Sequence, residues 1–318
     1  MRRQFYASKL YLFPTLLDSE RHRRFNARVS LDKLTIVGAG LLGGSLGLAA
    51  KERGLAKCVT ALVRRTESVS ECQALGVADK VTLDEAEAIS GADLIVLCTP
   101  VASMAGLAKR WLPHLKNGAV VTDVGSTKRQ LVDELTPMIS GAGAHFVGSH
   151  PMAGSAQAGP GAARADLFDG AVCVVTPTDA TDATALHSVN EFWKKLGSEP
   201  VVMSSDDHDQ LVARCSHLPH LLASALAKRV LDPSHGELQK QLCATGFRDM
   251  SRLASGSPVM WRDIVRSNRE AILAVIDEYS AELDRLRQLV SGDSSEAIEG
   301  WLDEAKRARD EWRAPNAD

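Results

Sequence analysis

The feature that most constrains the fold of this chain is a glycine turn that joins a short strand to a helix. Residues 34–37 form a β-branched apolar run that ends at the turn 38–43 (GAGLLG), and small and apolar residues follow at helical spacing. In such a turn Gly38 permits the tight bend, Gly40 lets the backbone approach a pyrophosphate, and Gly43 lets the helix pack close to the strand. The pattern predicts a dinucleotide-binding unit, with the phosphates at the helix N-terminus. The turn residues expected at the cofactor are Gly38, Gly40, Leu41, Leu42 and Gly43.

Further apolar runs follow at the spacing of a doubly wound parallel sheet. Near-continuous apolar runs separated by helical stretches indicate parallel strands that are covered on both faces. The strands are expected over residues 58–63, 94–98, 119–122 and 146–148, and a helix over 182–196 with strands at 171–175 and 201–203 is expected to complete the same layer. Ligands of such sheets bind beyond the carboxyl ends of the strands. The residues expected at this crevice are Thr99 and Pro100, beside the cofactor, and Ser126 and His150.

The end of the second predicted strand favours NADP over NAD. About 20 residues after Gly43, where an NAD site places Asp or Glu against the ribose 2′-OH, the chain has Val63. Arg64, Arg65 and Thr66 follow, and guanidinium groups can bind a 2′-phosphate bidentately. The alternative is that both arginines are solvated surface residues.

The second half of the chain has helical periodicity. Residues 258–290 carry apolar side chains at spacings of three and four, which predicts one long helix with a single apolar stripe. Gly292 ends this helix, Asp293 and Glu296 are expected to cap the next one, and a second stripe continues to Trp312. Long helices with little sheet to pack on need a partner. We therefore expect a homodimer that forms through the C-terminal helices.

These patterns predict an α/β chain with an N-terminal doubly wound Rossmann domain followed by an all-α dimerisation domain. The expected boundaries are a poorly ordered leader at 1–32, the Rossmann domain at 33–204 and a helical substrate and dimerisation domain at 205–318. The leader has a short apolar patch interrupted by Pro14, which is too short for a signal peptide or a membrane span.

Composition and charge limit the classes of partner. The chain has 318 residues, 37 of them Lys or Arg and 40 Asp or Glu, so its net charge is −3. This balance gives no support for nucleic acid or an anionic membrane as a partner, and a small-molecule substrate is expected. The six cysteines form no CxxC pair, which argues against a disulfide framework or zinc ribbon and favours the cytoplasm.

Five motifs in one order resemble those of the prephenate/arogenate dehydrogenases of tyrosine biosynthesis. They lie at residues 38–45, 123–128, 148–155, 216–220 and 246–252, and the resemblance extends from about Lys33 to Val290. It implies a Rossmann domain, a helical dimerisation domain, and the oxidative decarboxylation of a cyclohexadienol to a phenol. In that reaction hydride leaves ring C4 for the nicotinamide while the C4 hydroxyl loses its proton, and carbon dioxide is lost as the ring becomes aromatic.

The resemblance implies two catalytic residues. His150 matches the histidine that accepts the hydroxyl proton, a role that suits an imidazole of ordinary pKa at neutral pH. Ser126 lies in the matching GSTK turn and would bond the same hydroxyl or the nicotinamide region. The spacing alone leaves open that His150 is a loop cap and that Ser126 caps a turn.

The remaining site residues implied by the resemblance bind the substrate. Arg252 matches the residue that anchors a substrate carboxylate and Arg248 is a second candidate, although either can form a surface ion pair instead. Ser216 and His220 are expected to contact the substrate. His217 is interpreted as structural, and with no third ligand beside the two histidines no metal site is predicted. His208, in an acidic stretch expected to be an exposed turn, is a weaker candidate.

One departure from the family pattern affects the expected substrate. Many prephenate-using members have a glutamate where this chain has Ala156, and its absence, together with Arg64 and Arg65, resembles the NADP-linked arogenate branch. The sequence leaves prephenate and arogenate open. Two other functions also stay open: a β-hydroxyacid dehydrogenase or imine reductase, which typically relies on a lysine in the helical domain, and a dinucleotide sensor without catalysis.

Overall fold

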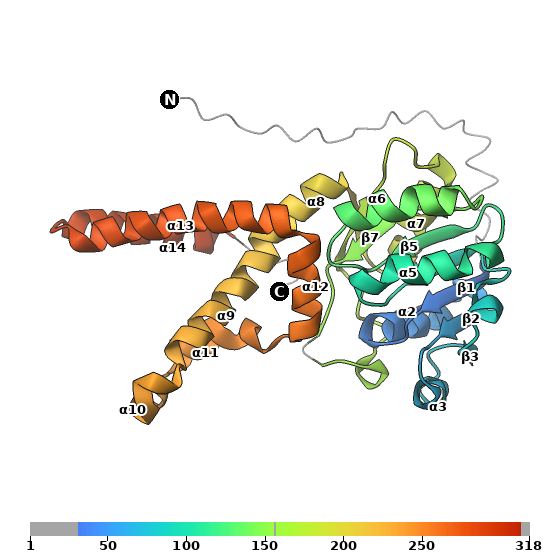
Figure 1. The fold of residues 1–318 in the computed structure, drawn as a ribbon, viewed down its shortest axis with the longest axis horizontal. Helices are drawn as coiled ribbons and strands as arrows, with labels where there is room; N and C mark the ends of the chain where they lie inside the picture. Colours follow the sequence, from blue (N-terminus) through green and yellow to red (C-terminus); the bar gives the residue numbers. More distant parts are fainter. Residues whose placement is uncertain (1–30, 156, 313–318) are drawn as a thin grey trace. The chain divides into compact units, whose positions relative to one another are not determined.

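A computed structural model describes residues 31–155 and 157–312 of the protein (Figure 1). They belong to two compact units. Unit 1 runs to Leu211 and also includes Gly256–Asn268, whereas unit 2 consists of Val212–Ser255 and the chain from Arg269 onward. Residues 1–30 of the predicted leader lie outside the described residues, and so does Ala156.

Unit 1 is built on a six-stranded parallel sheet. The strand order is β3-β2-β1-β4-β5-β6, so the chain starts in the middle and winds outward in both directions. The strands are β1 (Leu31–Val37), β2 (Ala56–Leu62), β3 (Lys80–Thr82), β4 (Leu94–Leu97), β5 (Val120–Asp123) and β6 (His145–Phe146). The predicted doubly wound Rossmann fold is confirmed, and the short β3 is an addition that the sequence did not indicate.

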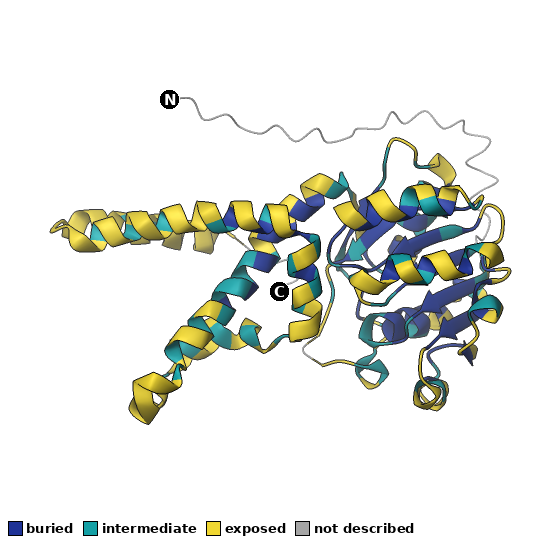
Figure 2. Cartoon of the chain, viewed as in Figure 1, coloured by how far each residue is buried: buried dark blue, intermediate teal, exposed yellow. Residues whose placement is uncertain are grey.

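Helices cover both faces of this sheet and enclose two separate apolar cores. The strands of the sheet are mostly buried, and its helices are buried on one side and exposed on the other (Figure 2). Leu46 and Trp193 contribute to one core, and Trp111 and Leu135 contribute to the other. All four side chains are fully buried, because each helix presents one apolar stripe to the sheet. The helices on the first face are α2 (Leu41–Glu52), α3 (Thr66–Ala74) and α7 (Ala183–Lys195), and those on the second are α4 (Glu85–Ile89), α5 (Val101–Trp111) and α6 (Arg129–Ser140).

A second, three-stranded sheet follows β6. It contains β7 (Gly148–Pro151), β8 (Val172–Thr176) and β9 (Glu199–Val202), and β7 runs antiparallel to β8. The prediction that the strands near 171–175 and 201–203 complete the main layer was therefore wrong. Apolar runs mark a strand but do not say which neighbour it pairs with.

Two further segments of unit 1 come from the predicted helical half. They are α8 (Ser205–Val212), whose last residue begins unit 2, and α12 (Pro258–Ser267). The long helix predicted over 258–290 is in fact two helices, α12 and α13 (Arg269–Ser291). The helix breaks at Asn268, whose buried side-chain amide donates a hydrogen bond to the backbone oxygen of Asp209 at 2.7 Å. This long-range contact overrides a periodicity that is continuous in the sequence.

Unit 2 is entirely helical within its described residues. Its α-helices are α9 (Leu218–Val230), α10 (Gly236–Gln241), α11 (Thr245–Ser251), α13 and α14 (Ser295–Glu311). A π-helical turn (Ala213–His217) precedes α9, and a 3-10 turn (Arg252–Ser255) follows α11. Ser294, rather than the predicted Asp293 and Glu296, is the N-cap of α14, because its hydroxyl accepts from the amide of Ala297.

Three short 3-10 turns complete the described secondary structure, at Leu112–His114, Pro160–Ala162 and Pro233–His235. None of the helices in the described ranges is long and apolar enough to cross a membrane.

Candidate active site

The glycine turn after β1 has the geometry that its sequence predicts. Gly38 has φ +95°, a left-handed conformation that favours glycine. A Cβ on Gly43 would lie 1.9 Å from the backbone oxygen of Gly38, so no side chain fits where α2 begins. A Cβ on Gly40, by contrast, would meet nothing within 4 Å. The turn therefore leaves no room for a side chain at Gly43, whereas the space beside Gly40 is not filled by neighbouring atoms.

Two features of this turn suit a dinucleotide. Within the described ranges no side chain caps the N-terminus of α2, so its first amides keep their donors for an anionic ligand. Beside the turn, the buried Thr99 Oγ1 has no hydrogen-bond partner among the described residues, and its Cγ2 lies 2.9 Å from where a Cβ of Gly38 would stand. Pro100 follows as the N-cap residue of α5 and is exposed. The residues present thus fit a pyrophosphate at α2.

The arginines that follow β2 lie at the same end of the sheet. Val37 at the end of β1 pairs with Leu62 at the end of β2, so Arg64 and Arg65 come two and three residues beyond that register. Both are exposed, and no ion pair of either appears among the described residues. Helix α3 begins at Thr66. The two guanidinium groups are therefore available to an anionic group near the turn.

The segment that contains Ser126 folds over a buried ion pair. Asp123 and Lys128 flank this segment, both side chains are fully buried, and the lysine ammonium contacts the aspartate carboxylate. The same carboxylate accepts hydrogen bonds from the amides of Gly125 at 2.7 Å and Ser149 at 3.0 Å. One carboxylate thereby fixes the residue before Ser126 and the residue before His150.

His150 lies within strand β7, opposite Val174 of β8, rather than just past a strand end as predicted. Its half-buried ring reaches helix α8, where its Nδ1 is 2.8 Å from His208 Nε2. The prediction of an exposed acidic turn around His208 was wrong, because this stretch is helical and His208 is only 1% exposed. The structure therefore joins His150, the predicted catalytic histidine, directly to His208, which was only a weaker candidate.

Asp209 completes this cluster and was not singled out from the sequence. Its Oδ1 is 2.8 Å from His208 Nδ1. The carboxylate also accepts from the first amides of the α6 region, Lys128 N at 2.8 Å and Arg129 N at 3.0 Å. The only available signal was that His208, Asp209 and Val212 share one face of a helix at spacings of three and four.

The four predicted substrate contacts all belong to unit 2. His220 is buried in α9, and this burial lowers the pKa of its imidazole, which favours the neutral form at neutral pH. Ser216 lies half-buried in the π-helical turn before it. Arg248 in α11 and Arg252 at the start of the next turn are exposed, and both elements pack against α9. Unit 2 thus brings the two arginines close to the helix that carries His220.

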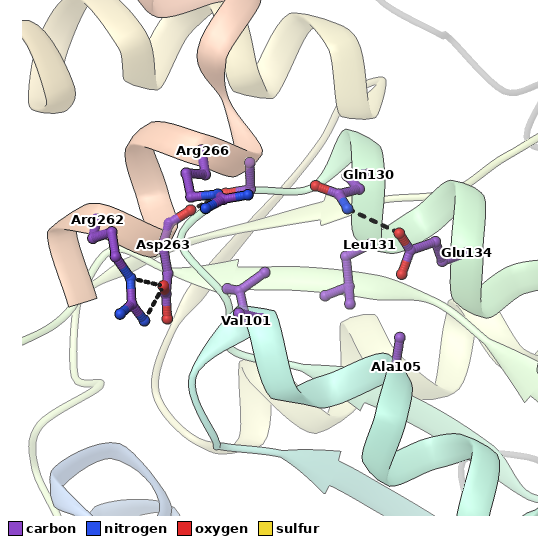
Figure 3. A pocket seen from close by; sticks show the side chains of 10 residues that line it. Val101, Ala105, Gln130, Leu131, Glu134, Arg262, Asp263 and Arg266 are labelled. Atoms are coloured by element: carbon purple, nitrogen blue, oxygen red, sulfur yellow. Dashed lines mark hydrogen bonds and ion pairs between the residues drawn. The ribbon is translucent and has the colours of Figure 1, made fainter. Parts of the chain in front are cut away.

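A separate cavity of about 510 Å³ lies between helices α5, α6 and α12 of unit 1 (Figure 3). Its polar lining includes Arg262, which pairs with Asp263, and Gln130, which donates to Glu134. Val101 and Leu131 supply apolar walls. None of the predicted site residues lines this cavity. Among the described residues, no three His, Cys, Asp or Glu side chains converge as metal ligands.

Comparison with known families covers most of the chain. Residues 46–202 match the model of the prephenate dehydrogenase nucleotide-binding domain, and residues 204–304 match that of the prephenate dehydrogenase dimerization domain. The chain belongs to the prephenate dehydrogenase family.

Individual relatives agree with this assignment. The prephenate dehydrogenase of Bacillus subtilis is 34% identical over 285 residues, which are 88% of this chain and 76% of that protein. A crystal structure of prephenate dehydrogenase from A. aeolicus, in complex with hydroxyphenyl propionate and NAD+, has a TM-score of 0.83 at 31% identity and covers 89% of this chain and 98% of that one. Arogenate dehydrogenase of Synechocystis has a TM-score of 0.77 at 31% identity, with 88% and 100% covered.

The family and fold predicted from five motifs are therefore confirmed. So is the main predicted function, a dehydrogenase of tyrosine biosynthesis that carries out an oxidative decarboxylation, in preference to the β-hydroxyacid, imine reductase and sensor alternatives. The nucleotide-binding domain and the NAD+ of the A. aeolicus structure identify the cofactor class as NAD(P).

Proposed function

We propose that the chain acts on prephenate, arogenate or both, with His150 as the acceptor of the ring hydroxyl proton. The observation that carries this assignment is the buried Asp123 carboxylate, which holds the amides of Gly125 and Ser149. Because each amide immediately precedes a predicted catalytic residue, Ser126 and His150 are fixed by one group at the carboxyl end of β5.

The proposed chemistry divides between a proton and a hydride. The bound nicotinamide supplies the hydride acceptor. His150 accepts the proton of the C4 hydroxyl as the hydride departs, so that the oxygen does not become positively charged as the carbonyl forms. The Ser126 hydroxyl is a donor and an acceptor, and it would bond the same substrate hydroxyl or the nicotinamide region. Loss of the ring carboxylate as carbon dioxide then leaves a phenolate, and its oxygen takes the proton back from His150 to give the phenol.

Unit 2 is proposed to bind the substrate anions. Arg252, with Arg248 as the second candidate, offers a planar fork of N–H donors that matches a carboxylate. Both are exposed, and no ion pair of either appears among the described residues, so they can reach a ligand. A neutral His220 and the hydroxyl of Ser216 provide hydrogen bonds to the uncharged parts of the substrate.

NADP is proposed as the preferred cofactor. Two exposed guanidinium groups follow β2, and the residue where an NAD site would place an acid is the buried Val63. A 2′-phosphate would gain charge-assisted hydrogen bonds there, whereas a ribose hydroxyl would find no carboxylate. The proposed contacts with the nucleotide are made by Gly38, Gly40, Leu41, Leu42, Gly43, Arg64, Arg65, Thr66, Thr99 and Pro100.

A homodimer is proposed to form through unit 2, whose match to a dimerization domain supports it. Several of its large apolar side chains are exposed, among them Leu238, Leu242 and Met250. Exposed apolar surface of this extent marks an association surface. In functional terms we assign cofactor binding to residues 33–204 and substrate binding with dimerisation to residues 205–318. Six unpaired cysteines suit a cytoplasmic enzyme.

A steady-state comparison tests this proposal. Prephenate and arogenate would each be assayed with NAD and NADP by following the nicotinamide absorbance, with 3-hydroxy acids and cyclic imines as control substrates. We expect turnover of at least one cyclohexadienol, with the higher kcat/KM for NADP. Turnover of the control substrates alone, or cofactor binding without turnover, would contradict the proposal.

A further inference from the structure

We propose that His208 and Asp209 form, with His150, a linear proton relay that sets the tautomer of His150 and shares the proton taken from the substrate. This inference rests on the proposed role of His150. The three groups are joined by two hydrogen bonds of 2.8 Å each, from His150 Nδ1 to His208 Nε2 and from His208 Nδ1 to Asp209 Oδ1.

The direction of each hydrogen bond in the relay is set by the carboxylate at its end. An ionised carboxylate only accepts, so the Asp209 carboxylate requires the proton of His208 to be on Nδ1. His208 Nε2 then carries a lone pair and accepts from His150 Nδ1–H. A neutral His150 with its proton on Nδ1 has its lone pair on Nε2, which is the atom able to accept a proton from the substrate.

The position of Asp209 explains why its carboxylate can serve as the anchor. Besides His208 it accepts from the amides of Lys128 and Arg129, at the positive end of helix α6. Its own backbone oxygen is held by Asn268. Three N–H donors therefore bind the Asp209 carboxylate. Because Asp209 is also only 3% exposed, these hydrogen bonds fix the orientation of its side chain.

The proton balance of the relay is simple. When the substrate O–H bond breaks, an N–H bond forms at His150 Nε2, and the ring becomes an imidazolium. The Nδ1 proton of His150 can then move to His208 Nε2, which places the positive charge beside the Asp209 carboxylate. No other reactant is needed, because the hydride leaves with the nicotinamide of the established reaction. After decarboxylation the phenolate oxygen takes the proton from His150 Nε2, and the extra proton on His208 Nε2 returns to His150 Nδ1, which restores both neutral imidazoles.

Other charged groups near the relay do not take over the role of the Asp209 carboxylate. Asp123 and Lys128 neutralise each other within their buried pair, and Arg129 pairs with Asp206 on the surface. Burial raises the pKa of the Cys173 thiol on the neighbouring strand, which keeps it neutral. The remaining acid of the first turn of α8, Asp207, bonds the Ser204 hydroxyl. Asp209 is therefore the carboxylate that stabilises positive charge on the two histidines.

The relay predicts a specific change in the pH profile of kcat. In Asp209→Asn and, separately, in His208→Gln, kcat should fall about 10²-fold or more, because His150 loses the fixed tautomer. The acidic limb of kcat should also move to lower pH, since removal of the carboxylate makes the histidine pair less basic. The KM for substrate and the Kd for cofactor should stay within about twofold. A merely structural role would lower stability or kcat without moving the limb.

Asp206→Asn is the matched control, because it removes an exposed carboxylate three residues earlier on the same helix and should leave kcat and its limb unchanged. In the double variant His150→Asn/Asp209→Asn, the second substitution should add little to the first. Thermal unfolding and cofactor binding would verify that each variant is folded. If one of the two relay variants does not fold, the other still tests the relay.

The possible failures are distinguishable. If His150→Asn retains full kcat, the proposed function of His150 fails. If His150→Asn loses activity but folded His208→Gln or Asp209→Asn keeps wild-type kcat and an unmoved acidic limb, the relay alone is overturned.

Discussion

The two units of this protein differ in what they bury. Unit 1 encloses its largest apolar side chains, such as Trp111 and Trp193, and also buries an ion pair and a His–Asp pair. Unit 2 leaves Leu238 and Leu242 68% and 76% exposed. The fold of unit 1 and its proposed acid–base groups are therefore packed within the unit, whereas unit 2 exposes the arginines and the apolar side chains that we propose bind the substrate and a second copy.

This contrast predicts that substitutions at the proposed acid–base residues of unit 1 change the rate of the chemical step, whereas substitutions at the exposed arginines of unit 2 change substrate affinity. The largest effect is expected for His150→Asn. Its kcat should fall by about 10²–10⁴ with little change in KM, because the proton transfer is made only in the transition state. Initial rates at saturating cofactor measure both parameters. A comparable loss in KM would mean that His150 binds the ground state instead.

Arg252→Gln in unit 2 should have the opposite signature. Loss of a charge-assisted contact of roughly 1.5–3 kcal/mol raises KM by about 10- to 150-fold and leaves kcat nearly unchanged. Arg248→Gln, one helix earlier, ranks the second candidate by the same assay. A fall in kcat at constant KM would show that Arg252 acts on the transition state. It would contradict the prediction that substitutions at the exposed arginines of unit 2 change affinity and not rate.

Dimerisation should depend on the exposed leucines of α10 and of its C-cap residue. Replacing both Leu238 and Leu242 by Asp should raise the dimer dissociation constant by at least about tenfold, because burying one Leu side chain contributes about 1.5–3 kcal/mol. Sedimentation over a range of concentrations measures this change. Leu83→Asp is the control, since it alters an exposed leucine of unit 1. Sedimentation of the unmodified protein as a monomer at micromolar concentration would contradict the dimer.

Cofactor selectivity should change more modestly. Arg64→Ala/Arg65→Ala should raise the KM for NADP by about tenfold, a value reduced by the exposure of both guanidinium groups. The KM for NAD should hardly change, because only the 2′-phosphate loses partners. An equal loss for both cofactors would place the arginines elsewhere on the nucleotide.

The smallest expected effect is on the stability of unit 2. Burial lowers the pKa of His220, so the unfolded chain binds this proton more readily than the folded chain. Stability should therefore be full above about pH 6.5, the ordinary value for histidine, and decrease as the pH falls below it. Thermal unfolding of wild type and His220→Gln between pH 5 and pH 8 tests this. The slope should be shallower in the variant.

The sequence predicts best what depends on neighbouring residues. The roles of Gly38, Gly40 and Gly43 follow from a strand, a turn and a helix that are adjacent in the chain, and the geometry agrees. Strand β3 has only three residues and carries too weak a pattern to be found. The assignment of β8 and β9 to the main sheet was wrong because an apolar run reveals a strand but not its pairing partner.

The long-range parts of the site could not be found from spacing. His150 and His208 are 58 residues apart, and Asp209 meets the α6 amides across about 80 residues. The break at Asn268 likewise depends on a partner 59 residues earlier. Each is a tertiary contact between polar groups that lie far apart in the sequence, and the local sequence of either partner does not reveal it. Periodicity reports which face of an element is buried, but it does not report what that face contacts.

The central claim is that unit 1 supplies the proton acceptor of the reaction through His150. The most direct test is the pH dependence of kcat for wild type and His150→Asn, measured with the preferred substrate and saturating cofactor. The wild-type kcat should fall at acidic pH, because a protonated imidazole cannot accept the hydroxyl proton. The residual kcat of His150→Asn should show no such limb. A variant that retains the acidic limb, or retains full kcat, would show that another group takes the proton.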